Sequence, residues 1–340
     1  LVKWRRNMEK VLVTGSTGFI GLHCIHQLIE KGYSVSGTLR SKSREEEVRS
    51  SLKKANLSDA NLSLYECDLM SDDGWEKAID GCDYVLHIAS PFINGLPDHE
   101  DDLIKPALTG TQRILKLSAK NPQIKKIIIT SSFAAVGDTF NGQTVFNESD
   151  WSDPNNNKIS AYNKSKTLAE KSAWDFMESN PSFKLTVINP VGVIGPMLSD
   201  DIGTSNLFVK KILDGSTSGN PGLHIGFVDV RDVARAHVDS IKNEKSDNKR
   251  IILSKDEIWV SELSEILRNL GYKAPKRNIP KWLISVLSLF DKQLGGLIPM
   301  IGKVRNIESS IFSEVFDWEL ISIEESAKVT AEQLKSMNQI

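Results

Sequence analysis

A glycine-rich turn near the N-terminus constrains the fold more than any other feature of this sequence. The residues Gly15-Ser16-Thr17-Gly18-Phe19-Ile20-Gly21 follow a short β-rich run over 10–14 and precede an amphipathic helical stretch over about 19–31. Glycines at these spacings let the backbone turn tightly and approach a pyrophosphate, and the start of the helix offers free N–H groups to the phosphates. The turn therefore predicts a strand–turn–helix unit that binds a nucleotide.

Apolar runs alternate with helical patterns along the first half of the chain. Further strands are expected over residues 33–39, 62–65, 84–88, 126–130 and 185–189. Strands that alternate with helices imply right-handed crossovers and a parallel sheet. Such a sheet binds its ligands at the carboxyl ends of its strands, so the functional residues should lie there.

The length of 340 residues allows one large domain and a smaller lobe. The predicted fold class is α/β, with a Rossmann-type doubly wound parallel sheet and a smaller C-terminal substrate lobe. The nucleotide-binding domain is expected to cover residues 8–190, with a returning segment near 222–256. Residues 191–221 and 257–340 are expected to form the substrate-binding lobe.

The composition argues against several classes of protein. A net charge of -2 gives no electrostatic basis for binding nucleic acid or an anionic membrane. Cys24, Cys67 and Cys82 are an odd number without metal-ligand spacing, so neither a disulfide framework nor a metal site is expected. No apolar stretch follows the basic residues near the start, which argues against a secretory signal and favours a cytoplasmic location.

The most apolar long segment of the chain covers residues 282–301. Two adjacent charges, Asp291 and Lys292, make a membrane-spanning helix costly there, and the segment also contains a glycine pair and Pro299. We therefore expect a buried helix, or a helix that lines a pocket, and no membrane partner.

The end of the second expected strand indicates the type of cofactor. NAD sites usually place an acidic residue there for the ribose 2′-hydroxyl, whereas this chain has Arg40, followed by Ser41, Lys42 and Arg44. Arginine and lysine can bind a 2′-phosphate through charge-assisted hydrogen bonds, so the cofactor is predicted to be NADP(H). Asp68, after the third strand, could accept a hydrogen bond from the adenine amino group or could cap the next helix.

A tyrosine and a lysine with YxxxK spacing are the candidates for the chemistry. Tyr162 and Lys166 stand four residues apart in an expected helix and therefore share one of its faces. A lysine ammonium near a phenol lowers the pKa of the phenol, so Tyr162 could exchange a proton with a substrate oxygen. Ser131 and Ser132 follow the strand at 126–130, where a hydroxyl can bind a substrate carbonyl oxygen.

Together these motifs resemble an extended short-chain dehydrogenase/reductase. Within that superfamily they resemble the dihydroflavonol reductase-like branch, which includes cinnamoyl-CoA, aldehyde and methylglyoxal reductases. The matching segments are VTGSTGFIG (13–21), the Arg40 turn, CDL (67–69), HIASP (87–91), TGT (109–111), ITSSFAAV (129–136), YNKSK (162–166), NPVGVIGP (189–196) and FVDVRDVARAHV (227–238). They cover most of residues 10–240, whereas the tail beyond about 260 matches only loosely.

The resemblance implies a role for individual residues. The pyrophosphate turn would be formed by Gly15, Gly18 and Gly21, with Thr17, Phe19 and Ile20 beside it. The 2′-phosphate would be bound by Arg40, and the adenine would be contacted by Asp68 and Leu69. The cofactor channel would be lined by Ala89, and the nicotinamide would be bordered by Pro190 and Val193. Ser132 matches the catalytic serine, with Ser131 as the close alternative. Tyr162 is implied to be the proton donor, and Lys166 to hold the nicotinamide ribose and to lower the pKa of the tyrosine.

The reaction implied by the resemblance is reduction of a small-molecule carbonyl by a monomer or homodimer. NADPH would give a hydride to the carbon of an aldehyde or ketone while Tyr162 gives a proton to the oxygen. Gly137 stands where plant flavonoid reductases carry an asparagine that binds the flavonoid, which argues against a flavonoid substrate. The substrate pocket is expected to draw on Phe92, Ile93, Phe133, Val193, the segment 201–208 with Ser205, and residues after 260.

Other function classes remain open. A nucleotide-sugar epimerase or dehydratase could use the same scaffold, although such isomerases usually retain NAD. A 3β-hydroxysteroid dehydrogenase-like enzyme is favoured only if residues 282–301 meet a membrane. A non-catalytic nucleotide-binding regulator would carry a broken triad, whereas Ser132, Tyr162 and Lys166 are all present.

Overall fold

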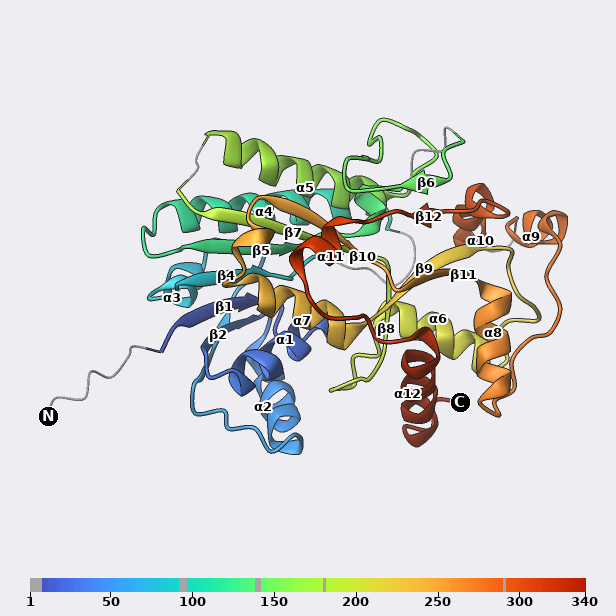
Figure 1. The fold of residues 1–340 in the computed structure, drawn as a ribbon, viewed down its shortest axis with the longest axis horizontal. Coiled ribbons are helices and arrows are strands. Elements are labelled where there is room, and N and C mark those ends of the chain that lie inside the picture. Colours follow the sequence, from blue (N-terminus) through green and yellow to red (C-terminus); the bar gives the residue numbers. More distant parts are fainter. Residues whose placement is uncertain (1–7, 92–96, 138–141, 180–181, 290–291) are drawn as a thin grey trace, which may run out of the picture.

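The computed structural model describes residues 8–91, 97–137, 142–179, 182–289 and 292–340. In this part of the chain, a seven-stranded parallel sheet forms the centre of the fold (Figure 1). Its strands are β1 (Lys10–Thr14), β2 (Ser34–Leu39), β3 (Leu62–Glu66), β4 (Tyr84–His87), β5 (Lys126–Thr130), β7 (Lys184–Pro190) and β10 (Lys249–Leu253). Their order is β10-β7-β5-β4-β1-β2-β3, with every neighbouring pair parallel, so the predicted α/β class with a Rossmann-type sheet is confirmed.

The strand order reverses between β1 and β4. From β1 the sheet continues to β2 and β3 on one side, and from β4 it continues to β5, β7 and β10 on the other. The connections that leave β1 and β4 therefore diverge, which opens the crevice where ligands of open α/β sheets bind. Gly15 follows β1 and Ile88 follows β4, so both lie at this point.

Helices cover both faces of the large sheet, which is why its central strands are apolar on both sides. Side chains alternate along a strand, and in β1 Val11 and Val13 belong to one core cluster while Leu12 belongs to the other. The first cluster packs against α1 (Phe19–Glu30), α2 (Glu45–Lys54), α7 (Val230–Ser240) and α11 (Ile311–Val315). The second packs against α3 (Trp75–Ile79), α4 (Asp101–Ala119) and α5 (Ala161–Ser179), and Figure 1 shows α4 and α5 together on that face.

A smaller group of elements follows the carboxyl ends of β7 and β10. Three strands, β8 (Gly192–Ile194), β9 (His224–Asp229) and β11 (Asp256–Trp259), form a second sheet, and β6 (Val145–Phe146) pairs with β12 (Asn306–Ile307). The helices of this group are α6 (Thr204–Leu213), α8 (Val260–Asn269), α9 (Lys281–Leu287), α10 (Lys292–Leu297) and α12 (Ile323–Ser336). A third core cluster joins them, with Phe227, Val209 and Leu263 among its buried members. Of the returning segment expected near 222–256, β10 lies in the large sheet and β9 in the second sheet.

The strands and the first helix were predicted closely. Each expected strand is present, and its boundaries differ from the prediction by at most one residue. The first helix ends at Glu30, and Gly32 follows with φ +79, a left-handed conformation that glycine adopts without a Cβ clash. Local periodicity was sufficient for these elements because they are short, apolar and bounded by glycine or polar turns.

The apolar segment over 282–301 does not form one helix. It contains α9, α10 and a 3-10 turn over Ile298–Met300, and Pro299 lies near the start of that turn, where a missing backbone N–H is tolerated. Ile284 is buried, whereas Trp282 is 68% exposed, so the expected burial holds only for part of the segment. Leu297 and Met300 line a cavity, which agrees with the alternative expectation that this segment lines a pocket. Among the described residues, no helix is both long and apolar enough to cross a membrane.

Candidate active site

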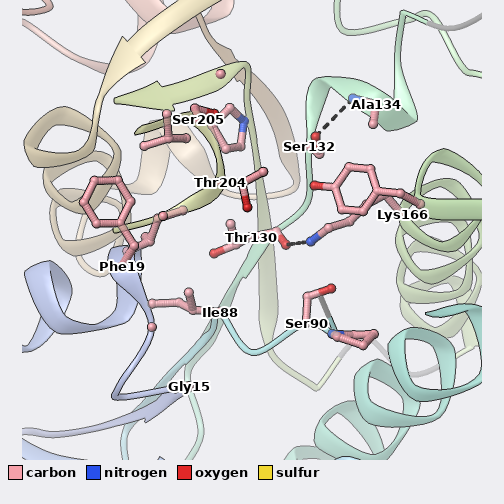
Figure 2. Close-up of a pocket in the computed structure, with 18 of the residues that line it drawn as sticks. Gly15, Phe19, Ile88, Ser90, Thr130, Ser132, Ala134, Lys166, Thr204 and Ser205 are labelled. Atoms are coloured by element: carbon pink, nitrogen blue, oxygen red, sulfur yellow. Dashed lines mark hydrogen bonds between the residues drawn. The ribbon is translucent and has the colours of Figure 1, made fainter. Parts of the chain in front are cut away.

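A cavity of about 1530 Å³ lies at the carboxyl ends of β1, β4, β5 and β7. It contains residues from the glycine turn, from the end of β2, from the loop after β5, from α5 and from the second lobe. Figure 2 shows its centre, with Gly15, Phe19 and Ile88 on one side and Ser132 and Lys166 on the other. The fold therefore brings the glycine motif, the serine pair and the YxxxK motif into one space.

The glycine turn depends on close backbone approaches. Gly15 has φ +75, and a Cβ there would lie 3.1 Å from the Cα of Ala89. At Gly21 a Cβ would lie 2.2 Å from the carbonyl oxygen of Gly15, so any side chain would displace the turn. Gly18 precedes α1, and no side chain caps the first turn of this helix. The helix start therefore offers backbone N–H groups and a favourable dipole to an anion.

A polar contact that the sequence interpretation missed holds β1 beside β4. The hydroxyl of Thr14 accepts hydrogen bonds from the backbone N–H groups of Ile88 (3.0 Å) and Ala89 (2.9 Å). It also hydrogen-bonds with Nδ1 of His87 at 3.0 Å. Burial lowers the pKa of His87 to about 3, so this ring is neutral at physiological pH. The HIASP segment was recognised as a match, but nothing local revealed that Thr14 is its partner.

Phe19, Ile20 and Ser205 all line the cavity, where the glycine turn meets the second lobe. Gly203 precedes α6 with φ +77, and a Cβ there would lie 2.7 Å from the ring of Phe19. The start of α6, with Thr204 and Ser205, thus lies close to the first helix (Figure 2).

Only some of the basic residues after β2 line the cavity. Arg40, Ser41 and Arg44 line the cavity, whereas Lys42 and Asp68 lie outside the set of described residues that do so. The Arg40 side chain is 78% exposed, with Nε 4.0 Å from a carboxylate oxygen of Asp68. Asp68 also accepts a hydrogen bond from the backbone N–H of Met70 at 2.7 Å within a turn, and the capping alternative is wrong, because the next helix, α3, is preceded by Gly74 and has no side-chain cap. Leu69, beside it, lines the cavity.

Tyr162 and Lys166 both point into the buried end of the cavity from α5. Burial raises the pKa of the Tyr162 phenol, and a hydrogen bond with Ser132 opposes that shift. Lys166 donates a hydrogen bond from Nζ to the carbonyl oxygen of Thr130 at 3.3 Å (Figure 2). Burial lowers the pKa of Lys166 to about 8, partly offset by the Glu170 carboxylate. The expected lowering of the tyrosine pKa by Lys166 is not found, because burial raises the pKa of the phenol and the opposing interaction is the hydrogen bond with Ser132.

The two serines of the pair have different partners. Ser131 is 5% exposed and donates a hydrogen bond to a carboxylate oxygen of Glu170 at 2.6 Å. Ser132 hydrogen-bonds with Tyr162 and accepts a hydrogen bond from the backbone N–H of Ala134 at 3.1 Å. Both residues line the cavity, but only the hydroxyl of Ser132 lies beside the phenol.

The remaining predicted residues lie along the same cavity. Ala89, Pro190, Val193, Thr17 and Phe133 all line it. Phe92 and Ile93 lie outside the described residues. The ring of Phe133 packs at right angles to Phe146 with centroids 5.8 Å apart.

Gly137 is explained by its neighbour Phe133. A Cβ at Gly137 would lie 2.3 Å from the Phe133 ring, so that ring occupies the space of a side chain at 137. The absence of an asparagine at this position is thus coupled to the aromatic residue at 133, a relationship that the sequence interpretation did not identify.

Comparison with known proteins identifies the family. Residues 11–253 match the NAD dependent epimerase/dehydratase family. The cinnamoyl-CoA reductase CAD2 of Medicago truncatula is 32% identical over 281 residues, which cover 80% of this chain and 82% of that protein. The NADPH-dependent methylglyoxal reductase GRE2 of Saccharomyces cerevisiae is 33% identical over 300 residues, which cover 79% and 84%. The crystal structure of yeast methylglyoxal/isovaleraldehyde reductase Gre2 complexed with NADPH matches with a TM-score of 0.79 at 27% identity, covering 97% of this chain and 100% of that chain.

The family match extends over the glycine turn, the serine pair and the YxxxK helix, and it spans more than half of the chain. They confirm the resemblance predicted from the motifs. The chain belongs to the NAD dependent epimerase/dehydratase family, within the extended short-chain dehydrogenases/reductases, and is an oxidoreductase.

Proposed function

We propose that this protein is an NADPH-dependent reductase that transfers a hydride to an aldehyde or ketone carbonyl, with Tyr162 as the proton donor. The observation that carries the proposal is the presence of Tyr162, Ser132 and Lys166 in the cavity that also contains the Gly15–Gly21 turn. A nucleotide-binding regulator has no need of a phenol, a hydroxyl and an amine at that place. The reaction is reversible, so the same residues serve oxidation of the corresponding alcohol.

The residues present fit a dinucleotide. The close backbone approaches at Gly15 and Gly21 fold the turn tightly beside the uncapped start of α1, where free backbone N–H groups can bind a pyrophosphate. Arg40 and Arg44 line the cavity where β2 ends without an acidic residue, which favours the 2′-phosphate of NADPH over the 2′-hydroxyl of NADH. The NADPH-dependent methylglyoxal reductase and the NADPH complex of Gre2 support this assignment. When bound, NADPH supplies the hydride.

Tyr162 holds the proton that the carbonyl oxygen receives. Its raised pKa keeps the phenol protonated at neutral pH, which a proton donor requires. Ser132, which hydrogen-bonds with Tyr162, orients the same substrate oxygen. Lys166 in its ammonium form stabilises the phenolate that remains after proton transfer and binds the nicotinamide ribose.

We assign substrate binding to residues 191–221 and 257–340, and cofactor binding to residues 8–190 with the segment near 222–256. Ser205, Leu297 and Met300 line the cavity from the proposed substrate lobe, and Phe133 lines it from the loop after β5. Leu297, Met300 and Phe133 offer apolar contacts to the carbon chain of an aldehyde or ketone, and Asp201, Glu257 and Arg305 supply charged groups in the same lining.

A substrate panel tests the proposal directly. Oxidation of NADPH would be followed by its absorbance in the presence of aldehydes, diketones, simple ketones and nucleotide sugars. We expect turnover with one or more aldehydes or ketones, faster with NADPH than with NADH. Turnover of nucleotide sugars without net cofactor oxidation would instead identify an epimerase, and no turnover with any carbonyl would overturn the reductase assignment.

A further inference from the structure

Glu170 is a buried carboxylate that the chemistry proposed above does not use. It lies on α5, four residues beyond Lys166, and its side chain is 0% exposed. A buried carboxylate is costly unless donors and a cation compensate it, so its partners indicate what it does.

Four side chains donate to this carboxylate from three elements and the loop after β5. Ser131 (2.6 Å) and Asn189 (2.7 Å) donate to Oε2. Arg250 donates from Nε to Oε1 at 2.5 Å, and the indole N–H of Trp174 lies 3.3 Å from the same oxygen. The Arg250 guanidinium is itself held, because it donates to two backbone carbonyl oxygens and lies over the Trp151 ring. The carboxylate therefore joins β7 and β10 to α5 directly behind the active site.

Asn189 extends this network to the serine beside the phenol. Its amide nitrogen donates both to Glu170 and to the backbone carbonyl oxygen of Ser132, the latter at 3.2 Å. Ser131, the preceding residue, is bonded to Glu170 through its hydroxyl. Two consecutive residues of the loop after β5 are thus tied to one carboxylate, which limits where the Ser132 hydroxyl can point.

Glu170 also faces Lys166, because residues four apart on a helix share one side. The Glu170 carboxylate opposes the effect of burial, which lowers the pKa of Lys166 to about 8. The other titratable groups near this amine are Tyr162 on the same helix and His87 from β4, which burial keeps neutral. Arg250, from β10, is the cation paired with Glu170.

We propose that Glu170 is a positioning residue of the active site, whose carboxylate, paired with Arg250, holds the Ser131–Ser132 segment in place and presents a negative charge to Lys166. The inference rests on the proposed function, since it concerns the amine and the hydroxyl that act there. A purely structural brace would also use these hydrogen bonds, but it would leave the protonation of Lys166 unchanged.

Three substitutions separate the two roles. Glu170→Gln removes the charge, Arg250→Lys disturbs the same buried pair while the carboxylate remains, and Glu178→Gln removes an exposed carboxylate near the end of α5 as a matched control. For each, kcat for carbonyl reduction would be measured against pH, together with the thermal unfolding midpoint. We expect Glu170→Gln to move the alkaline limb of kcat to lower pH by roughly half to one unit, because an ammonium without its nearby anion loses its proton more easily. Arg250→Lys should lower the unfolding midpoint without moving the limb, and Glu178→Gln should change neither.

A second readout requires no turnover. Because the folded-state pKa of Lys166 is about 8 and its ordinary value is 10.5, the unfolded chain binds more protons in this interval, and stability gains a contribution as the pH rises through it. In Glu170→Gln that gain should begin at lower pH. If the wild-type enzyme reduces no carbonyl, the proposed function fails and this stability profile still tests the role of Glu170.

The inference would be overturned if the alkaline limb of kcat lay at the same pH in wild type and Glu170→Gln. It would also be overturned if Glu170→Gln and Arg250→Lys moved that limb by the same amount. Either result would leave the reductase assignment intact. Should Glu170→Gln fail to fold, the double variant Glu170→Gln/Arg250→Gln leaves no unpaired buried charge, and the same downward shift is expected from it. The conservative Glu170→Asp variant keeps the charge and should retain a limb close to that of wild type.

Discussion

The two ends of the cavity differ in how their polar groups are held. At the catalytic end, Tyr162 hydrogen-bonds with Ser132, and the neighbouring Ser131 donates a hydrogen bond to the buried carboxylate of Glu170. At the other end, the Arg40 side chain is mostly exposed and meets its only described carboxylate partner at 4.0 Å. The polar groups of the first end are held by the packing around them, whereas the second end offers an exposed positive charge.

The difference teaches which property each end controls. A buried, mutually bonded set of groups keeps its geometry without a ligand, so it suits a step that depends on precise positions. An exposed guanidinium binds through charge-assisted hydrogen bonds that solvent and salt weaken. We therefore expect substitutions at the catalytic end to change the rate and substitutions at the Arg40 end to change cofactor affinity.

The largest effect is expected from Tyr162→Phe. Loss of the phenolic hydroxyl removes the proton donor, and kcat should fall by about 10³-fold. The NADPH dissociation constant, measured by fluorescence titration, should stay within about twofold of wild type, because the aromatic ring remains. A variant that retains most of its kcat would show that another group donates the proton.

Gly21→Ala should have the next largest effect, because it changes the turn between the two ends. Its Cβ would meet the carbonyl oxygen of Gly15 at 2.2 Å, so the backbone must shift. We expect a loss of roughly 1–3 kcal/mol in the free energy of unfolding, as for other overpacked sites, and markedly weaker NADPH binding. Gly295→Ala is the matched control, because the nearest atom to its Cβ would be 3.9 Å away. Equal behaviour of the two variants would refute the close-approach explanation.

Arg40→Ala tests the exposed end of the cavity. We expect NADPH affinity to fall about tenfold, because the variant loses one group that makes charge-assisted hydrogen bonds with the 2′-phosphate. NADH has no such phosphate, so its affinity should change little. The effect should shrink as the salt concentration rises, since the group is exposed. Titrations with both cofactors at low and high salt measure this, and equal losses for NADPH and NADH would remove the 2′-phosphate assignment.

Lys42→Ala sharpens the comparison with the smallest expected change. Lys42 lies outside the set of described residues that line the cavity, and its backbone N–H donates to Glu66 at 2.8 Å. The NADPH dissociation constant should therefore change by less than about twofold, because an exposed charge outside the cavity contributes little to binding. A loss as large as that of Arg40→Ala would place Lys42 among the phosphate ligands.

The large sheet and the residue types of the site could be predicted because the information is local. The glycine turn, the apolar strands and the YxxxK helix each lie within a short stretch, where periodicity and backbone sterics determine the conformation. The serine pair ends a strand, so its position at the carboxyl edge of the sheet followed from strand direction alone. The segment over 282–301 was predicted less well, because apolar content does not reveal how several short helices pack against a lobe.

The amino-acid sequence by itself determined the α/β class, the turn that can accept a pyrophosphate, and the identities of Tyr162, Lys166 and the serine pair. Only the tertiary structure decided which serine hydroxyl meets the phenol, that Glu170 and Arg250 join behind them, and that Phe133 fills the space beside Gly137. The physical reason is distance along the chain: Glu170 and Arg250 are 80 residues apart, and their contact exists only after β7, β10 and α5 have packed together. Local spacing cannot encode which buried donors satisfy a buried carboxylate, because burial itself is a property of the folded chain.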